Sequence, residues 1–315
     1  IGYQRWVQHH GPPPTHGFMA PLVHNLTAEQ KHQLTHYPAD PNCKVCQKAK
    51  MRKFPARTKE EKNRKRASKA NEWCHMDTIG KVQPKTCHKE QYYLFTMDDF
   101  SELVKVALER TKESDETRLS FLAMFPKNDR PATIVADNGT EFLGDFEVMR
   151  LEEGISLQES IPNRSTTNAR QNRKHALLHG MVRCALEQSG APAEMWGYCL
   201  LHVVHHHNHT AQGPEQKVPV QIHYGIEPAR NLLPFGTATA AYDDSIDVGN
   251  KFAPRGFDAI VVGYGPHGSY KVVPVSDVGK LARFSVKTVR EVRPRIGEYP
   301  MKSMKFSEQQ MQLFI

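Results

Sequence analysis

Short runs of alternating hydrophobic and polar residues recur along this chain, and most of them are followed by turn-forming residues. The alternation predicts β-strands at 71–79, 91–97, 103–109, 132–136 and 156–160. The segments between and after them predict helices at 114–125, 143–152, 165–189 and 192–209. Three successive strands, followed by strands that alternate with helices, indicate an α/β fold with a mixed sheet covered by helices on both faces.

The pattern changes after about residue 237. A surface-packed extension is expected at 215–235 and a polar break at 238–250, after which the runs DAIVVGY, SYKVVPV and FSVKTVREV predict a small β-rich, barrel-like domain. We therefore expect an N-terminal arm at 1–19, a small module at 20–50, a basic linker at 51–70, the α/β core at 71–237, the β-rich domain at 238–296 and a tail at 297–315.

Composition limits the class of protein. Only 39% of the 315 residues are hydrophobic, and no run of 18 apolar residues predicts a membrane span. Six cysteines in a chain of this length do not suggest a disulfide framework, which favours an intracellular protein. Because the first residue is Ile1, we expect cleavage from a precursor, either a polyprotein or an organellar import precursor.

The positive charge of the chain is concentrated in one segment. There are 42 Lys and Arg against 34 Asp and Glu, and residues 48–69 alone hold eleven basic and two acidic residues. Such a run predicts a nucleic-acid partner, and a solvated linker is the alternative. The candidate contacts in and near it are Lys48, Lys50, Arg52, Lys53, Arg57, Arg64, Lys65, Arg66 and Lys69, and the helix at 165–189 adds Arg170, Arg173 and Lys174.

Two histidines and two cysteines in the module at 20–50 have the spacing of a metal site. His32 and His36 are one helical turn apart, so both imidazoles can lie on one face of a helix, and Cys43 and Cys46 follow as a CxxC pair. Four nitrogen and sulfur ligands suit structural zinc. His24 is the reserve ligand, and a chance CxxC beside surface histidines is the alternative.

Two aspartates lie at the ends of predicted strands. Asp77 lies in NEWCHMDTIGK, and Asp137 ends the β-branched run of ATIVADNGTEF. Another 34 residues separate Asp137 from Asn172, which falls on the helix at 165–189.

These features occur within a longer series of motifs. In order they are NCKVCQKAK, DTIG, YYLFTMDDFSELVKVAL, ADNGTEF, RSTTNARQNR, MWGYCLLHVVHHHNHT and KFAPRGFDAIVVGYGPHGSYKVV. From about His32 to Arg293 the chain resembles the integrases of retroviruses and LTR retrotransposons, and its C-terminal part is similar to that of copia-type integrases.

The resemblance implies a ribonuclease H-like core, a His-His-Cys-Cys zinc module and an Asp, Asp, Glu triad. In such a triad three carboxylates hold two divalent metals about 3.5–4 Å apart for attack on a phosphodiester. Asp77 and Asp137 match the two aspartates, but Asn172 stands where the family has Glu. An amide can ligate magnesium but lacks the charge that helps to hold it, so magnesium is expected only if the core is still active.

Other acids and histidines offer alternatives. Glu187 lies more than four helical turns beyond Asn172, which leaves Glu141 and Glu159 as possible replacements for the third carboxylate. The histidines at 202, 205, 206, 207 and 209 are interpreted as packing and helix-end residues, because at most two or three of them could share a metal on one helix.

Three functional hypotheses remain: an active integrase in the nucleus that joins element DNA to a target, a transposon-derived binding protein, and a structural subunit of a ribonucleoprotein. Asn172 argues against the first. We favour a catalytically degenerate integrase-like protein that binds nucleic acid, RNA rather than DNA, within a large assembly of other proteins. An organellar ribosome is the example we favour, in a mitochondrion or another organelle.

Overall fold

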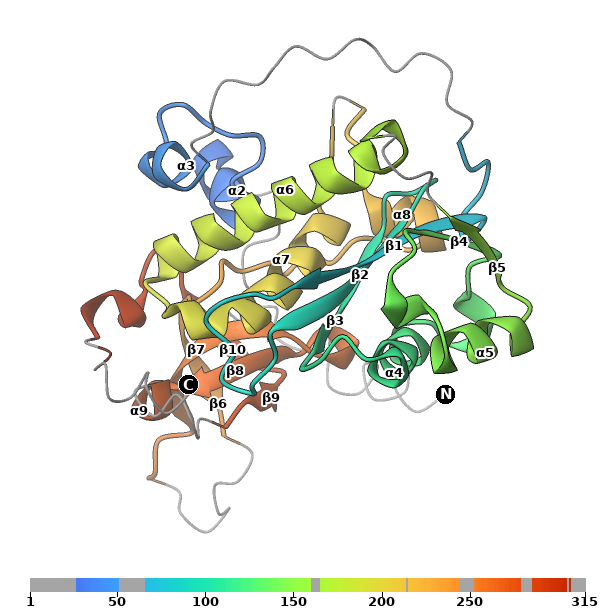
Figure 1. Cartoon of the computed structure of the whole chain (residues 1–315). Helices are drawn as coiled ribbons and strands as arrows, with labels where there is room; N and C mark the ends of the chain where they lie inside the picture. Colours follow the sequence, from blue (N-terminus) through green and yellow to red (C-terminus); the bar gives the residue numbers. More distant parts are fainter. Residues whose placement is uncertain are drawn as a thin grey trace, which may run out of the picture.

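The computed structural model describes residues 27–50, 66–159, 165–213, 215–243, 252–278, 285–304 and 306, with the backbone alone for 165–169. Figure 1 shows a central sheet with helices on both sides, a pair of short helices at one end of the long helix α6, and a second sheet below. Within this described part, no helix is both long and apolar enough to cross a membrane.

The central sheet has five strands in the order β3-β2-β1-β4-β5. β1 pairs antiparallel with β2, and β2 pairs antiparallel with β3, while β4 and β5 are parallel to β1. The predicted mixed sheet is therefore confirmed. The strands are β1 (Trp73–Gly80), β2 (Tyr92–Asp98), β3 (Val104–Glu109), β4 (Thr133–Ala136) and β5 (Ser156–Glu159).

Alternation along β2 separates the two faces of this sheet. Tyr93, Phe95 and Met97 pack in one apolar cluster, whereas Leu94 packs in another on the opposite face. The first cluster is covered by α6 (Ser165–Ser189) and α7 (Trp196–His209), and the second by α4 (Ser114–Met124) and α5 (Asp145–Glu152) (Figure 1). Each face of the sheet is thus sealed by two helices.

The N-terminal module consists of α2 (Ala28–Thr35) and α3 (Lys44–Ala49). Thr27 and Gln30 form a capping box that starts α2. The module lies against the C-terminal half of α6 (Figure 1), where Arg183 Nε donates to the carbonyl of Ala49 over 2.9 Å. It is therefore attached to the core rather than separate from it.

The second sheet is antiparallel, in the order β10-β6-β7-β8-β9. Its first strand corrects one expectation, because 238–242 forms a strand and not the start of a polar break; the alanine-rich run ATAAY lacks the β-branched residues that signal a strand. The run FSVKTVREV contributes to two short strands instead of one. The elements are α8 (Pro219–Tyr224), β6 (Ala238–Tyr242), β7 (Gly256–Tyr264), β8 (Tyr270–Pro274), α9 (Val275–Val278), β9 (Lys287–Val289) and β10 (Val292–Arg295).

The two faces of β7 belong to different cores. Ile260 and Val262 pack in the cluster that includes α7, whereas Ala259 and Val261 pack among the other strands of the second sheet. Through Ile260 and Val262, the second sheet therefore shares the hydrophobic cluster of α7 with the central domain.

Candidate functional site

The pairing of β1 with β4 brings the two predicted aspartates together. His75 pairs with Val135 in this parallel ladder, and the same register continued by two residues places Asp77 beside Asp137. Since Cys74 and Met76 pack on the α4 side, Asp77 faces α6. Strand order and alternation thus bring two carboxylates together at one place on the sheet.

The carboxyl group of Asp77 has an unusual proton affinity. Its side chain is 28% exposed. Burial, together with the neighbouring charge of Asp137, raises its pKa to about 7, while Lys112 acts in the opposite direction. Asp77 therefore holds a proton more readily than an ordinary aspartate does.

Lys112 is a cation beside the two aspartates, with a side chain that is 44% exposed. Its Nζ lies 2.8 Å from Oε1 of Glu141, whose side chain is only 1% exposed. Although burial lowers the pKa of Lys112, the charges of Glu141, Asp137 and Asp77 raise it overall. Sequence reasoning did not identify Lys112, because no local pattern links the turn after β3 to the ends of β1 and β4.

Above this site α6 offers uncharged groups. His175 Nδ1 lies 4.0 Å from Asp77 Oδ2, and the His175 ring packs edge-on against Phe95 at 4.0 Å between centroids. Burial lowers the pKa of His175 to about 4, with a smaller contribution from His179. Asn172, one turn earlier, is exposed, so no carboxylate from α6 completes the site at either position.

The alternative carboxylates are placed differently. Glu141 lies in a short 3-10 helix directly after Asp137 and acts electrostatically on Asp77. Leu157 packs on the α4 side, so Glu159, two residues later on β5, points to the face opposite Asp77. Glu187 forms an ion pair with Lys48 of the N-terminal module. Of the three, only Glu141 joins the acidic site.

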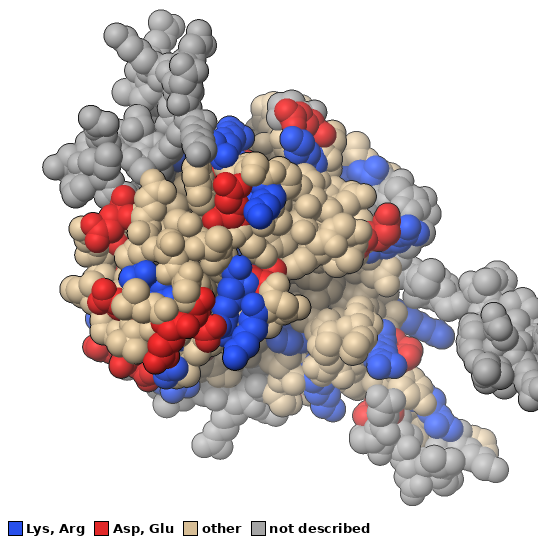
Figure 2. All heavy atoms as spheres, turned by 90° about the vertical axis from the view of Figure 1, so that its right-hand side faces the viewer, with Lys and Arg blue, Asp and Glu red and all other residues tan. Residues whose placement is uncertain are grey.

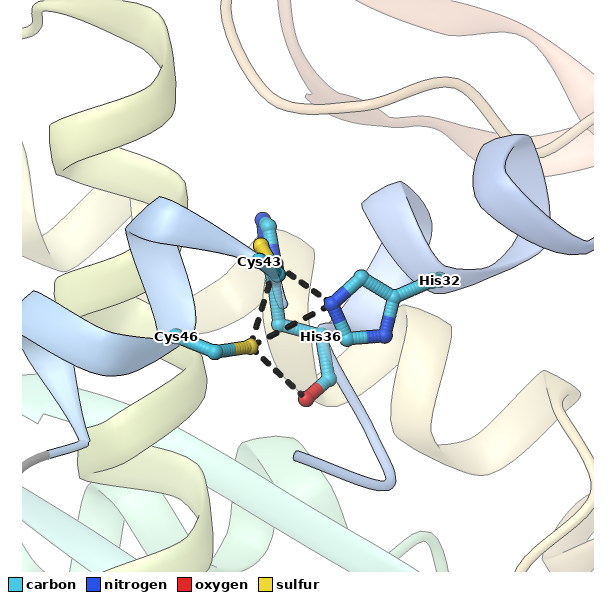
Figure 3. A group of neighbouring side chains, drawn as sticks. All are labelled: His32, His36, Cys43 and Cys46. Carbon is cyan, nitrogen blue, oxygen red and sulfur yellow. Dashed lines mark hydrogen bonds between the residues drawn. The ribbon is translucent and has the colours of Figure 1, made fainter. Parts of the chain in front are cut away.

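The predicted metal ligands meet in the N-terminal module (Figure 3). His32 lies on α2, His36 ends that helix in the left-handed conformation with φ 52°, Cys43 precedes α3 and Cys46 lies on its first turn. Their four ligating atoms all lie within 4.8 Å of one another. The turn at His36 reverses the chain and brings the CxxC pair back to the histidines.

The separations between these atoms fit a tetrahedral zinc ion. His36 Nδ1 lies 3.3 Å from His32 Nε2, and 3.6 Å from the sulfur of each cysteine. Cys46 Sγ lies 3.2 Å from His32 Nε2. Bonds of about 2.0–2.3 Å in tetrahedral geometry separate ligand atoms by roughly 3.3–3.8 Å. The cluster can therefore hold a metal, and its donor set suits zinc.

The predicted nucleic-acid contacts have different surroundings. Arg170 and Lys174 form ion pairs inside the protein, with Asp99 and Glu102 as acceptors. Their side chains are only 15% and 8% exposed, so these two residues hold α6 on the core and leave little surface for a ligand. Arg173 is exposed, as are Arg66 and Lys69.

Two more of the predicted contacts belong to the N-terminal module. Lys48 pairs with Glu187, and Lys50 Nζ donates to the carbonyl of His36. The predicted contacts that lie outside the described residues are Arg52, Lys53, Arg57, Arg64 and Lys65.

The histidine run of α7 is buried where three parts of the chain meet. His206 Nδ1 donates to the carbonyl of Leu34 over 2.9 Å, and its Nε2 lies 2.7 Å from the hydroxyl of Tyr264. His205 stacks on the Tyr264 ring at 4.1 Å. Burial lowers the pKa of His206 to about 4. Burial and ring stacking confirm the interpretation of the run as packing residues.

No protein-family model matches the chain, and no curated protein matches it. Among solved structures, it is similar to the catalytic core domain of HTLV-2 integrase in complex with magnesium, at 20% identity and a TM-score of 0.42, over 50% of this chain and 100% of that chain. A chain of the simian T-cell lymphotropic virus intasome in complex with PP2A regulatory subunit B56 gamma is 17% identical, with a TM-score of 0.46, over 86% and 92%. The catalytic core domain of BIV integrase is 18% identical, with a TM-score of 0.40, over 50% and 95%.

The strand order, and not these modest scores, defines the class. Three antiparallel strands followed by two parallel ones, with helices on both faces, form the ribonuclease H-like arrangement. The ribonuclease H-like fold that the sequence predicted is confirmed at this level. The chain thus has a ribonuclease H-like fold with a His-His-Cys-Cys cluster docked on its core.

Proposed function

We propose that this chain binds nucleic acid through its basic segments and does not catalyse strand transfer. One observation carries the proposal: the Lys112 ammonium is paired within the acidic site, and position 172 supplies an amide. Two divalent ions need several negative ligands to be held and dehydrated. The Lys112 cation reduces the negative charge available to such ions.

An activity assay tests the absence of chemistry. We expect the purified full chain to show no magnesium- or manganese-dependent nicking or strand transfer above the level of its Asp137→Asn variant. Strand transfer that this substitution abolishes would contradict the proposal and support the alternative, an active integrase.

Metal binding tests directly whether Asn172 and Lys112 are the reason for the expected inactivity. In the double variant Asn172→Glu and Lys112→Ala, a carboxylate replaces the amide and the resident cation is removed, so we expect Mn²⁺ binding that calorimetry can detect. The matched control, Asn172→Ala with Lys112→Ala, removes the cation without adding a carboxylate and should bind no better than the parent. Equal binding by both double variants would show that position 172 does not reach the two aspartates.

Nucleic-acid binding is expected to rest on the basic run. On the face shown in Figure 2, the Lys and Arg side chains are interspersed with Asp and Glu, and no continuous basic band appears there. Each phosphate neutralised on a single strand contributes about −0.7 to the slope of log affinity against log salt. Replacing Arg64, Lys65 and Arg66 by Ala should therefore flatten that slope by about two units and weaken binding to unrelated sequences alike.

A charge-matched control accompanies this experiment. Lys81, Lys127 and Lys217 are exposed lysines of the folded part, and replacing all three by Ala removes the same charge outside the basic run. We expect this variant to keep the slope of the parent. Equal effects of the two triple variants would mean that net charge alone drives binding.

RNA within a large assembly is the partner we favour. The nucleic acid and proteins that co-purify with the native chain test this part of the proposal. RNA together with many proteins would support it, whereas element DNA would support the active-integrase alternative.

The proposal also includes structural zinc bound by the N-terminal module. Metal analysis should give about one zinc per chain, and Cys46→Ser should lower that content and loosen the N-terminal module while the core remains folded. Ser68→Ala, which alters an exposed side chain outside the module, serves as the control.

A further inference from the structure

A glutamine of α6 contacts the metal cluster from the side of the core. Gln188 Oε1 lies 2.5 Å from Nε2 of His36, the ring nitrogen that is not directed at the cysteine sulfurs. Both residues are buried, at 7% and 2% exposure. Water is therefore excluded from this hydrogen bond, and the two side chains satisfy each other.

A third residue contacts the other end of the Gln188 amide. Gln188 Nε2 donates to the hydroxyl oxygen of Tyr299, which precedes the short 3-10 helix Pro300–Ser303 near the C-terminal end of the described chain. In this arrangement the amide directs its NH₂ group at Tyr299 and its oxygen at His36.

That orientation determines which nitrogen of His36 can bind a metal. An amide oxygen only accepts hydrogen bonds, so His36 Nε2 carries the proton and Nδ1 keeps its lone pair. Nδ1 is the atom that lies 3.6 Å from both Cys43 and Cys46. The hydrogen bond that His36 donates to Gln188 thus prepares His36 for ligation through Nδ1.

The segment that carries Tyr299 is held firmly against the end of α6. Met301 is 1% exposed and belongs to the central core. Gly190, at φ +70°, leaves room for this segment, because a Cβ at that position would lie 2.7 Å from Cα of Lys302. Tyr299 therefore has little freedom to leave Gln188.

We propose that Gln188 is a positioning residue for the zinc ligand His36, and that Tyr299 holds the Gln188 side chain against His36. The zinc affinity of the N-terminal module then depends on a contact made by Tyr299, which follows His36 by 263 residues in the sequence. By linkage, zinc binding in turn stabilises the docking of the segment that carries Tyr299. This inference rests on the zinc site proposed above.

Zinc affinity, measured on the full chain by competition with a chromophoric chelator, tests the inference. Loss of a group that orients a metal-bound histidine typically costs about 10–100-fold in affinity, and we expect Gln188→Ala to fall in this range. Gln188→Glu should restore at least the affinity of the parent, since a carboxylate accepts the same proton. Tyr299→Phe should weaken affinity by less than Gln188→Ala does, because the amide keeps its contact with His36 but loses the hydroxyl that holds it there.

The neighbouring residue provides a matched control. Glu187→Ala removes an ion pair between α6 and the module without touching a ligand, and its zinc affinity should equal that of the parent. Nitrogen NMR of the imidazoles adds a second readout: His36 should carry its proton on Nε2 in the parent and lose this preference in Gln188→Ala.

The possible failures are distinguishable. A parent chain that binds no zinc would overturn both the zinc site and the inference. A parent that binds zinc with Gln188→Ala at equal affinity would overturn the inference alone. If Gln188→Ala does not fold, Tyr299→Phe decides, and an affinity of this variant like that of Glu187→Ala would also overturn the inference.

Discussion

Asp77 makes the acidic site sensitive to pH at the scale of a single residue. Its pKa of about 7 lies above the ordinary value of 3.8, first because of burial and then because of Asp137. An acid whose pKa is raised in the folded state stabilises the fold below its unfolded pKa. That contribution is lost as the pH rises from about 4 through 7.

Asp77→Asn should remove this pH dependence. We expect the variant to gain stability relative to the parent between pH 5 and pH 8, by up to about 4 kcal/mol at about 1.4 kcal/mol per pKa unit. Urea unfolding at several pH values measures the difference, and the exposed Glu152→Gln serves as the control. A constant difference between Asp77→Asn and the parent over this range would disprove the raised pKa.

Lys112 should influence the same carboxyl group in the opposite direction. Because the Lys112 charge lowers the pKa of Asp77, Lys112→Ala is expected to raise that pKa further, whereas Lys127→Ala should not change it. Carbon NMR titration of the aspartate carboxyls measures both effects.

The residues of the two sites were predictable to different degrees. Asp77, Asp137 and the four metal ligands were identified in the sequence because strand ends and short spacings are local signals. Lys112, Gln188 and Tyr299 were not identified, since each acquires its role from a partner distant in sequence.

At the scale of elements, an ion network places α6 over the sheet. Arg170 pairs with both Asp99 and Glu102, and Asp99 also accepts from Nε2 of His75 over 3.1 Å and from the backbone of Ala67 over 2.9 Å. These contacts join the first turns of α6 to the loop after β2. Charged residues at the start of α6 therefore hold this helix against the loop after β2.

Breaking this network should be costly. Arg170→Ala removes one partner from Asp99 and one from Glu102, which keep His75 and Lys174. The loss should therefore be at most about 3–5 kcal/mol, which is typical of breaking a buried ion pair. Arg118→Ala, which breaks an exposed pair with Asp115, should cost less than about 1 kcal/mol. Chemical denaturation compares the two, and equal small losses would mean that the network does not hold α6.

Most elements of the central sheet were predictable for a physical reason. β1, β2 and β4 are short runs of largely buried residues followed by turn residues, which is a local signal in the sequence. β6 was missed because small alanines replace branched residues. The second sheet was predicted as a small barrel-like domain, and its packing on α7 follows from contacts with no local signature.

At the scale of the whole molecule, the shared core predicts cooperative unfolding. Ile260 is fully buried against the central domain, and truncating such a residue to Ala typically costs about 2–5 kcal/mol. We expect calorimetry to show a single transition for the central domain and the second sheet together, and Ile260→Ala to move all of it to lower temperature.

Hydrogen exchange gives an independent check of this coupling. The amides of α7 should exchange faster in Ile260→Ala than in the parent, although the substitution lies on β7. Two separate calorimetric transitions, with only the smaller one shifted, would instead describe an autonomous second sheet.

The position of His206 has a consequence for how this chain can be inherited and recombined. Its ring contacts a carbonyl of the N-terminal module and a tyrosine hydroxyl of the second sheet. A single imidazole of the core thus connects the module and the sheet. A crossover that exchanged only the C-terminal half with a relative lacking Tyr264 would leave a ring nitrogen buried without an acceptor or donor. Viable chimeras should therefore inherit His206 and Tyr264 together.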